Sequence, residues 1–493
     1  MNNLVIERAI AGLQQLRHSK PLAAPTSVTI IGAGITGLCC AYELQKLGVL
    51  VTLLEADPQH IGGRIRTLRE SDTLYAELGA MRIPKGHHLT RYYLETLGLK
   101  LRPFVQESDK VFALARGQKV ARNAAGYEAL KAKYALTESE RLMSVDDMWH
   151  LAVVSVLDGL TLDEKQALYS KRFTSPKLIE LDRMSLKDAF IAAGLSAEAR
   201  EYVTVIYGVS TLMQTALTEH LREELEGVWF NGFDEVVGGT DLLPQRMFAA
   251  MQGKIKYYQG AKVVGIHNQS DRVDVCYQLR DGTKSIMSSD FAICTLPFGV
   301  LGKIDFANSI SHVKQRAFSQ VNYDSATKVL IRTKNRFWEL NEKIYGGGNI
   351  YDAGLGHTWY PADNASAKDP RISNAPSYLL ASYTWGQHAR RIDTMNNLEL
   401  KEFIFLELKK VHPYLELTDI LSVMRWSWGN HTHSAGAYAF FNPSDQHDYF
   451  AAMQEPEGRL CFAGEHCSLY HSWIQGALLS AWNTIQYLKN QFK

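Results

Sequence analysis

The hydrophobic pattern of the chain begins with alternating strand and helix segments. Residues 28–31 form a short apolar, β-branched run, which predicts a buried parallel strand. A glycine-rich turn and a helical pattern over residues 38–47 follow, and Gly48 stands where a helix-ending glycine is expected. Residues 49–54 form a second apolar run. Together these segments predict a strand–helix–strand unit that begins near Ser27.

Helical spacing dominates the region from about residue 105 to residue 226. Apolar side chains recur at three- and four-residue intervals over residues 144–157, and Ser185 is a capping residue at the start of another helix. Residues 211–225 predict a third helix. Because glycine and β-branched runs are sparse in this region, we expect a helical insertion.

Strand patterns return in the second half of the chain. Residues 272–277 alternate between apolar and polar side chains, as a half-exposed strand does. Residues 291–296 predict a buried strand, and residues 325–332 and 377–385 predict two more. From residue 460 to residue 492 the pattern predicts a strand, a turn and a long helix.

Composition and charge place the chain among ordinary globular proteins. Of its 493 residues, 46% are hydrophobic and 21% are charged, which excludes disordered, collagen-like and coiled-coil chains. At roughly 150 residues per domain, about three domains are expected, or two with a large insertion. The net charge of +1 argues against a nucleic-acid-binding protein or one drawn to an anionic membrane.

The sequence favours a cytoplasmic protein. No apolar run approaches the roughly 18 residues that span a bilayer, and the amphipathic first 20 residues lack the pattern of a signal peptide. The six cysteines are too few for a disulfide scaffold. They show no C-x-x-C spacing, and pairs such as His431 and His433 lack further ligands, so no metal site is expected.

A glycine-rich turn carries the first chemical signal. Residues 32–37 fit G-x-G-x-x-G between a predicted strand and a predicted helix. Gly32 permits the tight turn, Gly34 lets a pyrophosphate approach the backbone, and Gly37 lets the helix pack on the strand. The helix N-terminus offers free N–H groups to phosphates. Glu55, at the end of the second strand, can accept hydrogen bonds from ribose hydroxyls.

The fingerprint alone does not separate NAD from FAD, but the segments that follow it do. Gly62-Gly63-Arg64 would bring the chain close to a cofactor and place a cation beside its pyrophosphate. Together with Glu77-Leu78-Gly79-Ala80-Met81-Arg82 and Phe462-Ala463-Gly464-Glu465 before a C-terminal helix, it resembles the flavin amine oxidases. Residues 79–84 look most like the L-amino-acid oxidases of that family.

The resemblance covers nearly the whole chain from Ser27 and implies an α/β fold. It consists of an FAD-binding Rossmann-type (glutathione-reductase-like) domain, a mixed-sheet substrate domain and a helical insertion. The expected division is an N-terminal helical extension (1–26), the FAD-binding domain (27–74, 231–322 and 449–493), the substrate domain (75–104 and 323–448) and the helical domain (105–230).

The resemblance also implies how FAD is held. Val263 would contact the adenine through its backbone, Glu465 would meet the ribityl and pyrophosphate region, and residues 473–477 would start the helix that faces the flavin pyrimidine. The cysteine that bonds the flavin in monoamine oxidases is replaced by Ala437, so FAD should be non-covalent. The residues expected at the cofactor are Gly32, Gly34, Ile35, Thr36, Gly37, Glu55, Ala56, Gly63, Arg64, Gly79, Ala80, Met81, Arg82, Val263, Glu465, Trp473, Ile474, Gln475 and Ala477.

The substrate residues follow from the same resemblance. Arg82 and Tyr383 would bind the amino-acid carboxylate, for which a planar guanidinium is well suited. Lys328, in an otherwise apolar strand, matches the lysine that holds a water near flavin N5. Trp473 matches the aromatic wall above the flavin. Tyr438 replaces an expected aliphatic residue, which leaves the preferred side chain open.

The implied function is FAD-dependent oxidation of an L-amino acid by hydride transfer from Cα to flavin N5. The products would be the 2-oxo acid, ammonia and hydrogen peroxide, with O₂ as the second substrate. We also expect a homodimer or higher homo-oligomer. The alternatives are an L-amino-acid 2-monooxygenase, which yields an amide, an amine or polyamine oxidase, which would not need Arg82, and a nucleotide-binding regulatory module without turnover.

Overall fold

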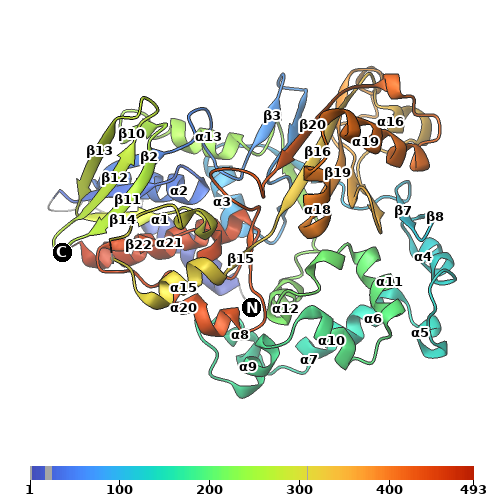
Figure 1. Ribbon diagram of the computed structural model, residues 1–493, viewed down its shortest axis with the longest axis horizontal. Helices are drawn as coiled ribbons and strands as arrows, with labels where there is room; N and C mark the ends of the chain where they lie inside the picture. Colours follow the sequence, from blue (N-terminus) through green and yellow to red (C-terminus); the bar gives the residue numbers. More distant parts are fainter. Residues whose placement is uncertain (1–2, 17–24, 308, 493) are drawn as a thin grey trace.

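A parallel sheet built from distant parts of the chain organises one half of the molecule (Figure 1). The computed structural model describes residues 3–16, 25–307 and 309–492. The strand order is β10 (Lys256–Gln259), β2 (Leu50–Glu55), β1 (Ser27–Ile31), β14 (Phe291–Cys294) and β22 (Leu460–Phe462). All four pairings are parallel. The apolar runs predicted near residues 28, 49, 291 and 460 are therefore neighbours in one buried sheet.

Helices pack beside this sheet, and the one that follows the glycine-rich turn is buried on nearly every side. α2 (Ile35–Leu44) packs against α21 (Ile474–Gln491), and Leu38 and Leu478 are fully buried between the elements. A short 3₁₀ turn, 45–47, extends α2 to Gly48, whose φ of 81° ends the helix as predicted. The surrounding helices are α1 (Asn3–Leu16), α3 (His88–Thr96), α13 (Leu242–Ala249), α14 (Phe298–Leu301), α15 (His312–Gln320) and α20 (Ala451–Gln454).

Smaller sheets flank the parallel one. β11 (Lys262–Asn268), β12 (Val273–Gln278) and β13 (Lys284–Ser289) form an antiparallel sheet, and β12 alternates buried and half-buried side chains as its sequence predicts. The remaining small sheets pair β5 (Ile83–Pro84), β9 (Phe233–Val236) and β6 (Leu101–Phe104), then β3 (Thr67–Arg69) with β4 (Tyr75–Glu77), and β15 (Asn322–Tyr323) with β21 (Ala439–Phe440).

A seven-stranded mixed sheet lies on the right of Figure 1, above the helical region. Its order is β20 (Ile420–Ser427), β16 (Ala326–Thr333), β19 (Ser377–Trp385), β18 (His357–Trp359), β17 (Gly348–Tyr351), β7 (Phe112–Ala115) and β8 (Gln118–Ala121). β16 lies between β19 and β20, and seven of its eight residues are buried. α18 (Gly386–Asp393) and α19 (Asn397–Val411) pack against this sheet, and α16 (Phe337–Glu342) contacts α17 (Pro370–Ser373).

The helical region fills the lower right of Figure 1. Ser185 caps its helix as predicted, with its hydroxyl accepting the Asp188 N–H in a capping box. The predicted helix over 144–157 is continuous but contains a π-helical stretch, 150–154. The helices are α4 (Ala124–Lys131), α5 (Glu138–Leu142), α6 (Val145–Trp149), α7 (Ser155–Asp158), α8 (Leu162–Ala167), α9 (Pro176–Asp182), α10 (Leu186–Ala192), α11 (Ala197–Tyr207) and α12 (Leu217–Glu226).

Two sequence expectations differ from the structure here. Residues 105–123 are not helical, because β7 and β8 form a hairpin and β7 adds to the mixed sheet beside β17. Arg116 and Gly117 turn the hairpin with φ of 47° and 74°. The helix predicted over 211–225 begins only at Leu217, because the backbone before it is used elsewhere: Thr215 O accepts the Leu186 N–H, and the Ala216 N–H donates to Phe441 O.

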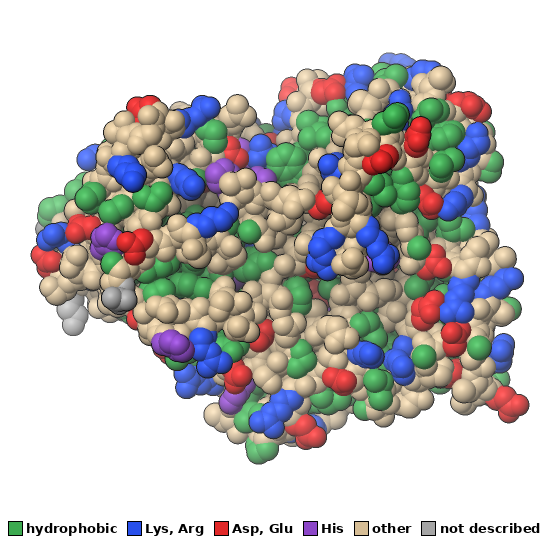
Figure 2. All heavy atoms as spheres, in the orientation of Figure 1, with side chains coloured by type: hydrophobic (Ala, Val, Ile, Leu, Met, Phe, Trp, Pro, Cys, Tyr) green, Lys and Arg blue, Asp and Glu red, His purple; other side chains and the backbone are tan. Residues whose placement is uncertain are grey.

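The surface shows no large field of one sign on the face drawn in Figure 2, where Lys and Arg are interspersed with Asp and Glu. No helix within the described residues is long and apolar enough to span a bilayer. The N-terminal extension is helical over Asn3–Leu16, and the rest of its predicted range up to residue 24 lies outside the described residues.

Candidate active site

One cavity of about 630 Å³ lies where the two sheets and the helical region meet. It begins at the carboxyl ends of the parallel strands, at Ile31 at the end of β1, Leu54 and Glu55 in β2, and Thr295 after β14. Open parallel sheets bind ligands at this edge. The cavity continues between the mixed sheet and the helical region. One end therefore lies at the glycine-rich turn, and the other, the aromatic end, is lined by Trp229, Trp359, Tyr383 and Trp473.

The three glycines of the G-x-G-x-x-G turn at residues 32–37 have different structural roles. A Cβ at Gly34 would meet nothing within 4 Å, so this backbone opens onto the cavity directly before α2. A Cβ at Gly37 would lie 2.0 Å from Gly32 O, so Gly37 allows the helix to lie against the turn. Gly32 has φ of 99°, a conformation that other residues rarely adopt. The turn thus offers both an exposed backbone and a helix N-terminus to a ligand.

Glu55 is held in place at the end of β2. Its Oε2 accepts the Ala33 N–H at 2.7 Å, and its Oε1 accepts the Asp57 N–H at 2.7 Å. Burial raises the pKa of Glu55 to about 7, although these backbone bonds oppose the shift. A ligand hydroxyl that donated to this carboxylate would favour its charged form.

Arg64 pairs with Glu465 across the cavity wall. The Nη2–Oε2 distance is 3.0 Å, and Nη1 donates to Ala437 O at 3.1 Å. Glu465 Oε1 also accepts the Ala439 N–H at 2.6 Å. Against the effect of burial, the Arg64 charge holds the pKa of Glu465 below its usual value. The cation predicted beside a pyrophosphate is thus already neutralised by an acidic partner.

Arg82 lies at the aromatic end of the cavity without an acidic partner. Nη1 donates to Gln106 Oε1 at 2.9 Å, and no described carboxylate forms an ion pair with the guanidinium. Its Cζ is 4.9, 5.3 and 5.2 Å from the ring centroids of Trp229, Phe233 and Trp359. Burial lowers the pKa of Arg82 to about 10, which still leaves it charged at neutral pH. A caged, unpaired cation of this kind is suited to bind an anion.

Tyr383 and Lys328 face each other across paired strands. They are register partners between β19 and β16, and Lys328 Nζ lies 4.7 Å from the Tyr383 ring centroid. Nζ donates to Glu77 O at 3.1 Å and Gly79 O at 2.7 Å, with Met81 Sδ at 3.5 Å. Burial lowers the pKa of Lys328, and the Glu77 carboxylate opposes this shift.

The remaining predicted substrate residues complete the aromatic end. The Tyr438 hydroxyl donates to Asp324 Oδ2 at 3.2 Å. Trp473 lies nearly parallel to Phe233, with centroids 6.3 Å apart, and its indole N–H donates to Glu223 Oε1 at 3.1 Å. Glu223 lines the cavity, and the sequence analysis missed it because nothing in the acidic run of α12 marks one carboxylate as facing a site.

Most predicted site residues gather on this one cavity. The lining includes Gly32, Gly34, Ile35, Thr36, Glu55, Ala56, Gly63, Arg64, Gly79, Ala80, Met81, Arg82, Val263, Tyr383, Tyr438, Glu465, Trp473, Ile474 and Ala477. Three predicted residues lie behind the lining. Gly37 packs on the turn, Lys328 Nζ donates to Gly79 O, and Gln475 Oε1 accepts the Thr90 N–H at 3.1 Å.

Comparisons with known proteins agree with this geometry. The family described as flavin containing amine oxidoreductase matches residues 35–487. An L-amino-acid oxidase of Siganus canaliculatus is 31% identical over 475 residues, covering 95% of this chain and 86% of the relative. An L-amino-acid oxidase of Vipera ammodytes ammodytes is 28% identical over 467 residues, covering 94% and 92%.

Solved structures share the fold at low identity. Cyclohexylamine oxidase from Brevibacterium oxydans IH-35A superposes with a TM-score of 0.75 at 18% identity, covering 94% of this chain and 99% of that one. Wild-type putrescine oxidase bound to putrescine gives 0.70 at 19% identity, covering 95% and 99%. The predicted α/β fold, with its nucleotide-binding parallel sheet and mixed second sheet, is confirmed.

Proposed function

The chain belongs to the flavin-containing amine oxidoreductase family, and within that family we propose that it is an L-amino-acid oxidase. The observation that carries the proposal is Arg82, a charged guanidinium that lines the cavity among aromatic rings with no acidic partner within ion-pair distance in the described chain. Its natural ligand is a carboxylate, which an amino acid has and a simple amine lacks. Relatives named L-amino-acid oxidases over most of the chain support the same choice.

FAD is the non-covalent cofactor of this chain, and the residues present fit it. Gly34 leaves its backbone open, α2 points its N-terminus at the cavity, and the buried Glu55 carboxylate would be relieved by ribose hydroxyls. Val263 and the start of α21 at Ile474 would hold the two ends of the cofactor. Bound FAD supplies a two-electron acceptor that takes a hydride from the substrate Cα and returns the electrons to O₂.

The side chains of the aromatic end would orient the substrate. Arg82 and Tyr383 bind the carboxylate, since both line the cavity and the Arg82 charge acts on the Tyr383 phenol. Trp473 and Tyr438 exclude water from the reacting carbon. Loss of the ammonium proton is the one proton transfer needed before hydride transfer. Lys328 Nζ donates to two carbonyl groups and to Met81 Sδ, so the water proposed to assist the oxidative half would take the place of the weak sulfur acceptor.

The overall reaction converts an L-amino acid and O₂ to an imino acid and hydrogen peroxide, and water then hydrolyses the imino acid to a 2-oxo acid and ammonia. A 2-monooxygenase would instead lose CO₂ and form an amide, and an amine oxidase would accept the substrate without its carboxylate. The cytoplasmic location and the homodimer or higher homo-oligomer also stay predictions.

Product analysis tests the proposal. The purified flavoprotein is mixed anaerobically with each of the twenty L-amino acids and with the decarboxylated amine of each, and the flavin absorbance is followed. We expect bleaching by at least one L-amino acid, much slower bleaching by its amine, and, in air, 2-oxo acid, ammonia and peroxide in equal amounts. Bleaching by amines alone, or an amide product, would contradict the oxidase; no bleaching at all would favour a regulatory module.

A further inference from the structure

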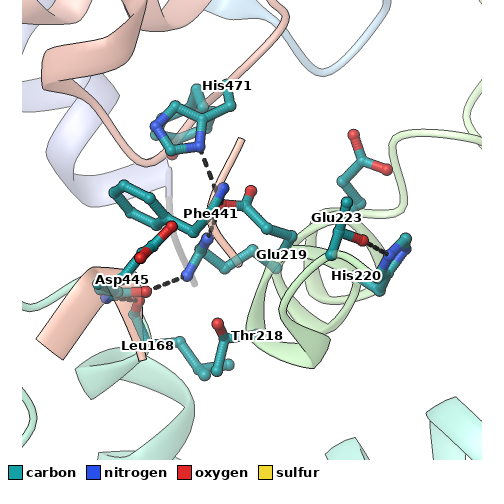
Figure 3. A network of polar contacts seen from close by, with 12 residues as sticks. Leu168, Thr218, Glu219, His220, Glu223, Phe441, Asp445 and His471 are labelled. Atoms are coloured by element: carbon teal, nitrogen blue, oxygen red, sulfur yellow. Dashed lines mark hydrogen bonds and ion pairs between the residues drawn. The ribbon is translucent and has the colours of Figure 1, made fainter. Parts of the chain in front are cut away.

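α12 carries two glutamates one helical turn apart that have opposite surroundings. Glu219 forms an ion pair with Arg222 at 3.0 Å and a hydrogen bond with His471 at 2.9 Å, and these partners lower its pKa to about 2 in spite of burial. Figure 3 shows that the Glu223 carboxylate points away from this network. Glu223 lines the cavity instead. The chain neutralises one carboxylate internally and presents the other to the cavity.

The contacts of Glu223 fix the carboxylate but leave its charge unpaired. Oε2 accepts the Trp229 indole N–H at 2.9 Å, and Oε1 accepts that of Trp473 at 3.1 Å. Both donors are neutral, and no Lys, Arg or His in the described residues forms an ion pair with Glu223. Burial raises its pKa, while the two indoles and the more distant Arg82 oppose the shift. A cationic ligand group would supply the missing partner.

Trp229 connects this carboxylate to Arg82. The Arg82 Cζ lies 4.9 Å from the Trp229 ring centroid, and the indole nitrogen of the same ring bonds Glu223. The cavity therefore presents a fixed cation and a fixed anion around one indole. Trp473 and Phe230 also line it, and aromatic faces pack methylene groups and attract organic cations. A ligand that spanned the two charges would need a carboxylate at one end and a cation at the other.

The cavity wall around Glu223 contains further acidic side chains. Glu224 and Asp146 also line the cavity, and they accept hydrogen bonds from Trp149 and Tyr207 at 2.8 and 2.7 Å. Arg122 also lines the cavity, and its guanidinium donates to Gly348 O. Three carboxylates thus face this part of the cavity, which favours a cationic group there.

We propose that Glu223 binds the cationic end of the substrate side chain, so that the preferred substrates are L-amino acids with basic side chains such as lysine, ornithine and arginine. This inference rests on the proposed L-amino-acid oxidase function. The α-carboxylate lies at Arg82, the methylene chain lies along the indoles, and the distal ammonium or guanidinium pairs with Glu223. Glu223 is then a specificity-determining residue.

Two substrates that differ in one charge test the proposal. L-Lysine and L-norleucine share the same carbon chain, and norleucine lacks the terminal ammonium. We expect the wild-type enzyme to have the higher kcat/KM for lysine. Glu223→Gln should lower the ratio of kcat/KM for lysine to kcat/KM for norleucine roughly 10- to 100-fold, the range of a charge-assisted hydrogen bond.

A matched control lies on the same helix. Glu226 accepts a hydrogen bond from Tyr169 at 2.7 Å and is not part of the cavity lining, so Glu226→Gln removes an equal charge without touching the site. It should leave the lysine-to-norleucine ratio unchanged. If Glu223→Gln does not fold with flavin bound, Glu223→Asp keeps the charge and should retain a preference for lysine at reduced kcat/KM.

The proposal is overturned if the wild-type enzyme has the higher kcat/KM for norleucine. It is also overturned if Glu223→Gln lowers kcat/KM equally for both substrates, since the carboxylate would then act on the α-amino group that both share. These outcomes differ from failure of the proposed function. In that case neither amino acid would bleach the wild-type flavin, whereas an amine such as cadaverine would.

Discussion

The two ends of the cavity are built in different ways. At the cofactor end, Gly32, Gly34 and the start of α2 present backbone groups from one continuous segment. At the substrate end, Arg82, Tyr383 and Trp473 bring side chains from three segments far apart in sequence. Part of the cofactor site is backbone that a local glycine motif provides. A substrate must be recognised by side chains whose positions depend on the whole fold.

The charges at the two ends differ in the same way. At the cofactor end, Arg64 and Glu465 neutralise each other at 3.0 Å. At the substrate end, Arg82 and Glu223 form no ion pair with each other or with any other described residue. Unpaired, half-buried charges cost free energy in the free protein, and a ligand that supplies their partners recovers it. The substrate end is therefore suited to bind a ligand with opposite charges. At the cofactor end, these two charges are already paired within the protein.

Replacing Arg82 should break the substrate end and leave the cofactor end intact. Arg82→Ala removes two charge-assisted bonds to the carboxylate, a loss of roughly 3–5 kcal/mol after a discount for non-additivity. We expect kcat/KM for amino acids to fall about 10² to 10⁴-fold while FAD stays bound. Steady-state peroxide assays and the flavin spectrum measure the two effects.

The decarboxylated amine is the control for Arg82. It has no carboxylate to lose, so its much lower rate should change little in the variant. Arg82→Lys should recover part of the amino-acid activity, because an ammonium offers a point charge and not a planar fork. Equal losses on the amino acid and its amine would mean that Arg82 is structural, and the amino-acid oxidase proposal would lose its main support.

Filling Gly34 should damage the cofactor end by sterics alone. A Cβ there meets no protein atom within 4 Å and projects where the backbone opens on the cavity, so Gly34→Ala should fold normally. By the cost of an inserted methyl group in a packed site, roughly 1–3 kcal/mol, FAD affinity should drop about 5- to 150-fold. Titration of apoprotein with FAD measures the change.

Gly37→Ala is the matching variant, and it should affect the stability of the apoprotein rather than contact FAD directly. Its Cβ would lie 2.0 Å from Gly32 O, so the apoprotein itself should lose stability. Thermal unfolding of both apoproteins separates the two predictions. If Gly34→Ala lowered apoprotein stability as much as Gly37→Ala, the assignment of Gly34 to the cofactor would be wrong.

Glu55→Gln should weaken the cofactor end through a single polar group. The carboxylate is proposed to accept bonds from ribose hydroxyls, and loss of its charge costs about 1.5–3 kcal/mol of binding, or roughly 10- to 100-fold in FAD affinity. Glutamine keeps one acceptor for the Ala33 or Asp57 N–H, which limits damage to the fold. Unchanged FAD affinity in calorimetric titration would remove Glu55 from the cofactor site.

The same contrast explains how much the sequence could predict. The strand over 28–31, the glycine turn that leads into a helix and the Ser185 cap are local patterns, and the structure contains each of them. β7 was missed because it becomes a strand through pairing with β17, more than 200 residues away in sequence. The late start of α12 depends likewise on the bond from Ala216 to Phe441.

Site residues were easier to predict where they belonged to a spaced motif than where only their residue type was known. The resemblance carried by Gly79-Ala80-Met81-Arg82 predicted that Arg82 contacts the substrate, and Arg82 does line the cavity. Glu223 carries no such signal, because Glu219, Glu224 and Glu226 stand on the same helix and the fold alone decides which carboxylate faces the cavity. Arg64 was expected beside the pyrophosphate, but its ion pair with Glu465 was not predicted, because the two residues lie 401 positions apart in the chain.

The smallest predicted effect is a pH dependence of FAD binding that belongs to the cofactor end. Burial raises the pKa of Glu55 in the protein to about 7. Ribose hydroxyls that donate to the carboxylate would favour its charged form, so bound FAD lowers this pKa, and binding at pH values below about 7 must release a proton. FAD affinity should therefore fall as the pH decreases through 7, by up to about tenfold between pH 8 and pH 6. Glu55→Gln has no proton to release and should bind FAD weakly with a flat profile over this range. A wild-type profile as flat as that of the variant, measured by fluorescence titration at constant ionic strength, would show that Glu55 does not titrate with cofactor binding.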